Sequence, residues 1–117
     1  MRQRSGTRAV SERHRFDAAA LEAWLSARLP GLRAPLAISQ FEGGQSNPTF
    51  LLQSASGEYV LRKKPPGKLL PSAHAVDREY KVITALHTTG FPVPRTYGLE
   101  DESVIGTMFY VMDFMEG

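Results

Sequence analysis

Hydrophobic residues first recur with a helical period between residues 16 and 31, FDAAALEAWLSARLPG. Asp17 is a residue type that caps helix N-termini, and Pro30 and Gly31 are residue types that end helices. At 3.6 residues per turn, four apolar side chains share one face of this helix: Leu21, Trp24, Leu25 and Leu29. The pattern predicts an amphipathic helix that begins after Asp17 and ends before Pro30.

Three short segments rich in strand-forming residues come next, and each is bounded by residues typical of turns. They are PLAISQF at 35–41, PTFLLQ at 48–53 and EYVLRKK at 58–64. A glycine-rich tip separates the first two, and SASG separates the second from the third. Connections this short predict three consecutive antiparallel strands.

A second helix is predicted over residues 72–90, SAHAVDREYKVITALHTTG, with Ser72 as its N-cap and Gly90 at its end. Its apolar face carries Val76, Tyr80, Ile83 and Leu86. TYGLE and VIGTMFYVM then read as two strands joined at DES. The predicted fold class is α+β: a five-stranded antiparallel sheet with one packed helix and an N-terminal helix.

Length and composition fit one globular domain, with 117 residues, 42% hydrophobic and 22% charged. The chain contains no cysteine, and its three histidines show no metal-ligand spacing. We therefore expect no metal bound by this chain alone. No apolar run reaches the roughly 18 residues of a membrane span, so we expect a cytoplasmic protein with no membrane partner.

The N-terminal part of the chain is basic, with seven arginines before Ala34 and a sequence pI of about 9.2. This charge permits a nucleic-acid-binding interpretation, but no known nucleic-acid-binding motif accompanies it. We expect no nucleic-acid partner. Residues 1–15 are predicted to be a flexible basic tail, and residues 16–117 the folded domain.

Charged residues stand at positions where the patterns predict burial. The pleat of the third strand sends Arg62 and Lys63 to opposite faces of the sheet, while Glu79 lies on the apolar stripe of the second helix. A carboxylate removed from water needs a partner, which favours pairing with Arg62, or with Lys63 if the register shifts by one. The alternatives are a solvated Glu79 at the edge of the stripe and an edge strand protected by its charges.

The hairpin tip in FEGGQSNPTFLL adds flexible, hydrogen-bonding residues to this pair. A glycine-rich tip, a strand cation and a helix carboxylate together fit a polyphosphate cradle. An ordinary hairpin connection remains the alternative. The five tip residues are Gly43, Gly44, Gln45, Ser46 and Asn47.

These segments, together with REYKVI and PVPRTYGLEDESVIGTMFYVMDFMEG, resemble the N-terminal lobe of the aminoglycoside phosphotransferase family, small-molecule kinases of the protein-kinase-like fold. The nearest branch is the one associated with acyl-CoA dehydrogenases. The resemblance implies that ATP binds with its phosphates under the glycine-rich tip and beside Arg62, which Glu79 orients. An arginine at position 62, where the family usually has lysine, leaves open whether Arg62 or Lys63 contacts phosphate.

The resemblance also implies an adenine pocket, lined by Met112 and read by the backbone carbonyl of Asp113 and amide of Met115. Met112 at the end of an apolar strand is equally compatible with plain core packing.

The family's catalytic base and Mg2+-binding motifs lie in a C-terminal lobe, and none of them occurs in this sequence. We therefore expect the nucleotide-binding part of an ATP-dependent phosphotransferase that is inactive alone, with Mg2+ and a small-molecule substrate bound only together with the missing lobe. The alternative is a non-catalytic regulatory or interaction module of the same fold.

Overall fold

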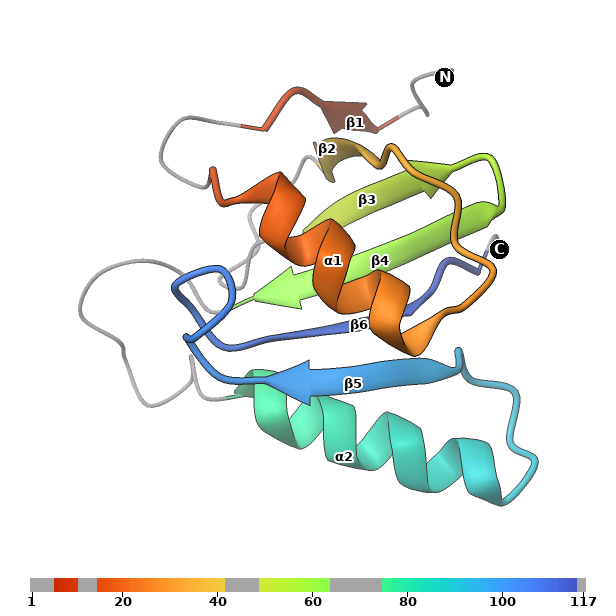
Figure 1. Cartoon of the computed structure of the whole chain (residues 1–117). Helices are drawn as coiled ribbons and strands as arrows, with labels where there is room; N and C mark the ends of the chain where they lie inside the picture. The colour runs from red at the N-terminus through yellow and green to blue at the C-terminus, as the bar shows by residue number, and fades with distance from the viewer. Residues whose placement is uncertain (1–5, 11–14, 42–48, 64–74, 116–117) are drawn as a thin grey trace.

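The computed structural model describes residues 6–10, 15–41, 49–63 and 75–115. They form an α+β fold in which two helices pack against one antiparallel sheet with strand order β1-β2-β3-β4-β6-β5 (Figure 1). The elements are β1 (Thr7–Arg8), α1 (Ala18–Arg28), β2 (Ala37–Phe41), β3 (Thr49–Ser54), β4 (Gly57–Lys63), α2 (Ala75–Thr88), β5 (Thr96–Glu100) and β6 (Phe109–Asp113). The predicted fold class is confirmed.

The first helix forms as its sequence predicts. The amide of Ala20 donates a hydrogen bond to Asp17 Oδ1 at 3.0 Å, so Asp17 is the N-cap. The helix crosses the face of the sheet that is turned toward the viewer in Figure 1, over β3, β4 and β6. Leu21, Trp24 and Leu25 are buried against that face.

The core lies between α1 and this face of the sheet. Antiparallel pairing sets Leu61 opposite Val111, and the alternation of the strands places both side chains under α1. The sheet residues of this core are Phe50, Leu52, Tyr59, Leu61, Phe109 and Val111. The neighbouring positions along each strand point to the other face, where the candidate site lies.

The sheet has six strands rather than the predicted five. The additional strand, β1, pairs Thr7 with Phe41 and Arg8 with Gln40, and it lies inside the segment predicted to be a tail. Two residues are too few to show a hydrophobic period, so the sequence pattern could not predict this strand.

The second helix packs against β5 and β6. Of its predicted apolar face, Val76 is fully buried, while Tyr80, Ile83 and Leu86 are half-buried. Gly90, with φ +84°, ends this segment as predicted, and the amide of Phe91 donates to the carbonyl of Leu86 at 3.3 Å. The predicted N-cap, Ser72, lies outside the described residues.

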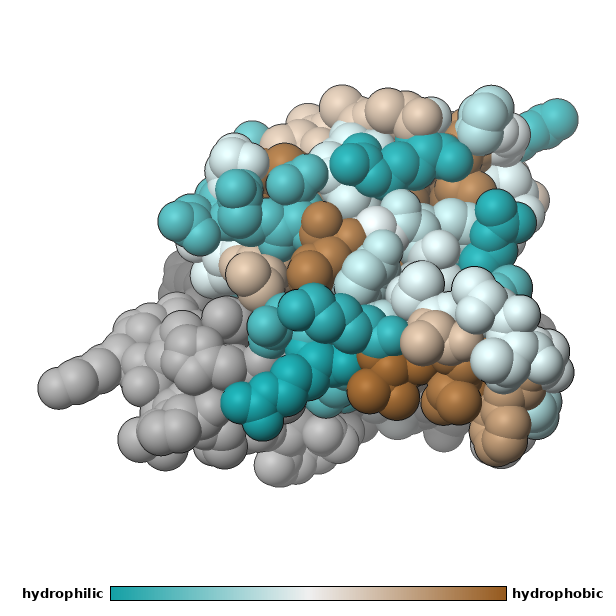
Figure 2. All heavy atoms as spheres, turned by 90° about the horizontal axis from the view of Figure 1, so that it is seen from below, coloured by the Kyte–Doolittle hydropathy of each residue, from teal (hydrophilic) through white to brown (hydrophobic). Residues whose placement is uncertain are grey.

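Hydrophobic and hydrophilic patches lie next to one another on the side of the molecule that Figure 2 shows. Val82 on α2 is 57% exposed, and Phe91 just after the helix is 56% exposed. Among the described residues, neither helix combines the length and apolar composition needed to cross a bilayer.

The last two strands differ from prediction in their bounds. Residues 101–108 form a turn that contains Gly106 at φ +89°, so β6 begins at Phe109 and not near Val104. β5 pairs with β6 through an irregular register between Thr96 and Gly98, which makes Tyr97 the extra residue of a bulge.

Candidate functional site

Arg62 and Glu79 form an ion pair on the face of the sheet opposite α1. Arg62 Nε lies 2.7 Å from Glu79 Oε1, and Arg62 Nη2 donates to Glu79 Oε2 at 3.0 Å. The two side chains retain 20% and 31% of their exposure, so the pair is partly shielded from water. The predicted pairing of Arg62 with Glu79 is confirmed, and the interpretation of Glu79 as an unpaired, solvated carboxylate is wrong.

Two further side chains hold the pair, and the sequence patterns did not identify them. Arg62 Nη1 donates to Thr49 Oγ1 at 3.2 Å, which links the guanidinium to the start of β3. The hydroxyl of Tyr110 donates to Glu79 Oε1 at 3.0 Å. Thr49, Arg62 and Tyr110 are cross-strand neighbours in one row of the sheet, so their side chains meet on one face.

Lys63 lies on the opposite face. Its ammonium faces the rings of Phe16 and Phe50, with Nζ 5.8 and 5.7 Å from their centroids. Only 3% of the residue is exposed, and burial lowers the pKa of the amine. The structure therefore brings Arg62 to Glu79, as the unshifted register predicts, and does not bring Lys63 there.

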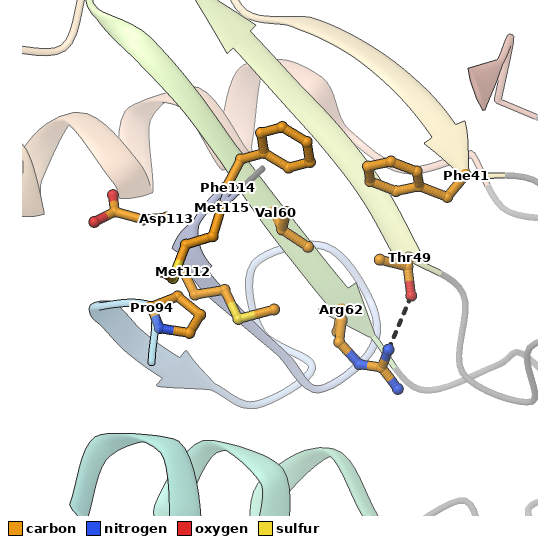
Figure 3. Close-up of a pocket in the computed structure, with 9 residues that line it drawn as sticks. All are labelled: Phe41, Thr49, Val60, Arg62, Pro94, Met112, Asp113, Phe114 and Met115. Carbon is orange, nitrogen blue, oxygen red and sulfur yellow. Dashed lines mark hydrogen bonds between the residues drawn. The ribbon is translucent and has the colours of Figure 1, made fainter. Parts of the chain in front are cut away.

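A pocket of about 390 Å³ opens on the site face (Figure 3). Arg62 stands at one end, Val60 and Met112 line the middle, and the segment after β6 closes the other end. The rings of Phe41 and Phe114 stack at one side, with centroids 6.2 Å apart. The complete lining is Phe41, Thr49, Val60, Arg62, Pro94, Met112, Asp113, Phe114 and Met115.

The main chain at the end of β6 is fixed from both sides. The amide of Asp113 donates to the carbonyl of Arg95 at 2.9 Å, and the amide of Phe114 donates to the carbonyl of Glu58 at 3.2 Å. The carboxylate of Asp113 turns away from Arg62 in Figure 3 and accepts a 2.5 Å hydrogen bond from the Tyr97 hydroxyl. The pKa of Tyr97 is raised by burial and by this contact.

The remaining predicted site residues fall into two groups. Met112, Asp113 and Met115 line the pocket that contains Arg62, and Met115 is 53% exposed. Gly43, Gly44, Gln45, Ser46 and Asn47 lie outside the described residues, although Phe41 and Thr49 on either side of them both line the pocket. Within the described ranges, no group of three or more His, Asp or Glu side chains is arranged to hold a metal ion.

The chain is similar to known proteins over most of its length. It is 53% identical over 113 residues to "Acyl-CoA dehydrogenase family member 11" of Rattus norvegicus, covering 92% of this chain and 14% of that protein. It is 52% identical over 113 residues to the protein of the same name in Homo sapiens, with the same two coverages. The chain thus spans about one seventh of the length of these relatives.

A solved structure from Ralstonia eutropha, assigned as an aminoglycoside phosphotransferase, superposes with a TM-score of 0.74 at 48% identity. The match covers 88% of this chain and 29% of that one. A family model described as "Phosphotransferase enzyme family" matches residues 37–117. The matched residues include both partners of the Arg62–Glu79 pair and the whole lining of the pocket, and the chain therefore belongs to the phosphotransferase enzyme family.

Proposed function

We propose that this chain is the ATP-binding part of a kinase that transfers phosphate to a hydroxyl group of a small molecule. The observation that carries the proposal is a fixed guanidinium at one end of a largely apolar pocket. Such a pocket suits a ligand with a flat apolar ring and an anionic tail. Membership of the phosphotransferase family supports this choice over other ligands with that shape.

The phosphate end of the proposed site is Arg62. Its contacts with Glu79 and Thr49 involve Nε, Nη1 and Nη2, and each Nη carries two N–H groups, so one donor on each remains for phosphate oxygens. Arginine binds phosphate in a bidentate manner. We therefore assign the phosphate contact to Arg62 rather than Lys63, and we expect the glycine-rich tip at residues 43–47 to cover the phosphates.

The adenine end of the proposed site lies between Val60, Met112 and the two stacked rings. The hydrogen bond from the amide of Phe114 to the carbonyl of Glu58 fixes the main chain between Asp113 and Met115. We propose that the carbonyl of Asp113 and the amide of Met115 form hydrogen bonds with the edge of the adenine ring.

Residues outside this chain would complete the reaction. Mg2+ neutralises phosphate charge in enzymes of this kind, and we propose that its ligands, the catalytic base and the acceptor pocket belong to a C-terminal lobe. Alone, the chain would bind nucleotide without transferring phosphate. The names of the long relatives support an association with an acyl-CoA dehydrogenase. A non-catalytic nucleotide-binding module is the second candidate, because the sequence contains no catalytic motif of the family.

Nucleotide binding by the 117-residue chain can be measured by NMR titration with ATP at millimolar concentrations. We expect chemical-shift changes around Val60, Arg62 and Met112. Arg62→Ala should weaken ATP binding at least tenfold, because charge-assisted hydrogen bonds to phosphate are lost. Arg28→Ala is the matched control, since Arg28 also pairs with a carboxylate, Glu100 at 3.6 Å, but lies on the α1 side of the molecule.

The double variant of Arg62→Ala with Glu79→Gln tests whether the pair acts as one unit. Because Glu79 acts through Arg62, the double variant should lose little more affinity than Arg62→Ala alone. Additive losses would contradict this coupling. If millimolar ATP causes no chemical-shift changes at the pocket residues of the wild-type chain, the proposed function is contradicted.

A further inference from the structure

Tyr110 is the second donor to the carboxylate of Glu79. Its hydroxyl lies 3.0 Å from Oε1, the same oxygen that Arg62 Nε approaches to 2.7 Å. Tyr110 is 1% exposed and stands directly across the β4–β6 ladder from Arg62. Its ring also contacts that of Tyr80 on α2, with centroids 5.9 Å apart.

This geometry gives Glu79 two anchors on adjacent strands. Arg62 holds the carboxylate from β4, through the hydrogen bond of Nη2 to Oε2 and the close approach of Nε to Oε1. The hydroxyl of Tyr110 adds a donor from β6, which further restricts the movement of the carboxylate. The phenol remains a donor at every physiological pH, because burial and the neighbouring carboxylate raise the pKa of Tyr110. The side chains that face Tyr110 from the surrounding elements are Arg62, Glu79 and Tyr80.

We propose that Tyr110 is a positioning residue that holds Glu79, and through it the guanidinium of Arg62, in the phosphate-binding orientation before any nucleotide arrives. This inference rests on the proposed nucleotide-binding function. It adds that α2 is kept on the sheet by a hydrogen bond that the ion pair does not provide. The phosphate end of the site is therefore preorganised by a side chain that touches no part of the ligand.

The test is Tyr110→Phe, which removes one oxygen and keeps the ring. Binding should be measured for three probes: ATP, inorganic tripolyphosphate and adenosine. We expect the affinities for ATP and tripolyphosphate to fall about tenfold, the effect of losing one hydrogen bond to a charged group, and the affinity for adenosine to stay the same. General damage to the fold would weaken all three probes.

A matched control is Tyr97→Phe, which removes the other tyrosine–carboxylate hydrogen bond, at the opposite end of the pocket. It should leave tripolyphosphate binding unchanged. The ligand-free chain provides an independent readout, since Arg62 Nε is buried 2.7 Å from Glu79 Oε1, although its N–H does not form a hydrogen bond of good geometry. Its N–H signal should exchange slowly with water in the wild-type chain and much faster in Tyr110→Phe.

The outcomes separate the two proposals. If Tyr110→Phe keeps wild-type tripolyphosphate affinity and the slow Arg62 signal, while Arg62→Ala loses binding, the role of Tyr110 is refuted and the proposed function stands. If the wild-type chain binds neither ATP nor tripolyphosphate, both are refuted. A tripolyphosphate-selective loss, together with faster exchange at Arg62, supports the inference.

Discussion

Side chains at the end of α1 lie close to the backbone of β5, and this predicts a large effect of adding a methyl group at Gly98. Gly98 has φ +143°, a backbone conformation that residues with a Cβ rarely adopt. A Cβ built there would lie 3.2 and 3.3 Å from two ring carbons of Trp24 and 3.0 Å from Arg28 Nε. The arginine can move, but the indole is held by a 2.9 Å hydrogen bond to Glu100 and by the ring of Phe109.

The expected cost of Gly98→Ala follows from these contacts. The positive φ costs about 1–2 kcal/mol, and forcing the indole out of its place costs about 1–3 kcal/mol. Alanine also lowers the conformational entropy of the unfolded chain, which stabilises the folded state by about 0.5 kcal/mol. We therefore expect the free energy of unfolding to fall by about 2–4 kcal/mol, a large share of the roughly 6–18 kcal/mol typical of a chain of this length.

Urea unfolding followed by fluorescence measures this loss directly, because Trp24 is the only tryptophan of the chain. Two other glycines separate the contributions. Gly106, at φ +89° with no atom within 4 Å of a Cβ, should lose only about 1–2 kcal/mol when changed to alanine. Gly31 has neither constraint and should lose nothing. If Gly98→Ala is no more destabilising than Gly106→Ala, the close packing of Trp24 on this backbone is refuted.

Three further predictions concern charge and capping. Lys63→Met should raise the free energy of unfolding by about 1 kcal/mol at pH 7, because the cost of burying the ammonium exceeds the gain from its two cation–π contacts. The same variant should leave ATP affinity unchanged. A loss of affinity would favour Lys63 over Arg62 as the phosphate contact. The pKa of Tyr110 is raised above its ordinary value of 10.0, so as the pH rises the unfolded chain loses this proton before the folded chain does. The free energy of unfolding should therefore fall above pH 10, by up to about 1.4 kcal/mol per pH unit before solvent screening reduces the effect. Tyr110→Phe should make this decline less steep. Asp17→Ala should cost about 1 kcal/mol of stability in thermal or urea unfolding, and no cost would show that α1 does not need its N-cap.

Most of the fold was predictable because its signals are local. The cap at Asp17 and the apolar face of Leu21, Trp24 and Leu25 define α1 within a dozen residues. Short runs of strand-forming residues between turn residues define β3 and β4 in the same local way. The Arg62–Glu79 pair was also predictable, because a charge at a position patterned for burial needs a partner of opposite sign.

The contacts that the sequence did not reveal depend on three-dimensional geometry. Tyr110 satisfies an apolar pattern as well as phenylalanine would, so only the structure shows its hydroxyl at Glu79, 31 positions away along the chain. Tyr97 reaches Asp113 because a bulge adds one residue to β5, and a bulge leaves no clear period in a five-residue strand.

The two faces of β4 have an evolutionary consequence. Leu61 and Lys63 face α1, while Val60 and Arg62 face the pocket. Successive side chains of β4 therefore alternate between the two faces of the sheet. Loss of a single codon of β4 before position 62 would exchange the two faces and place the ammonium of Lys63 where the guanidinium of Arg62 now meets Glu79. Insertions and deletions should therefore be confined to the loops on either side of β4, because a single substitution leaves the alternation of its two faces intact.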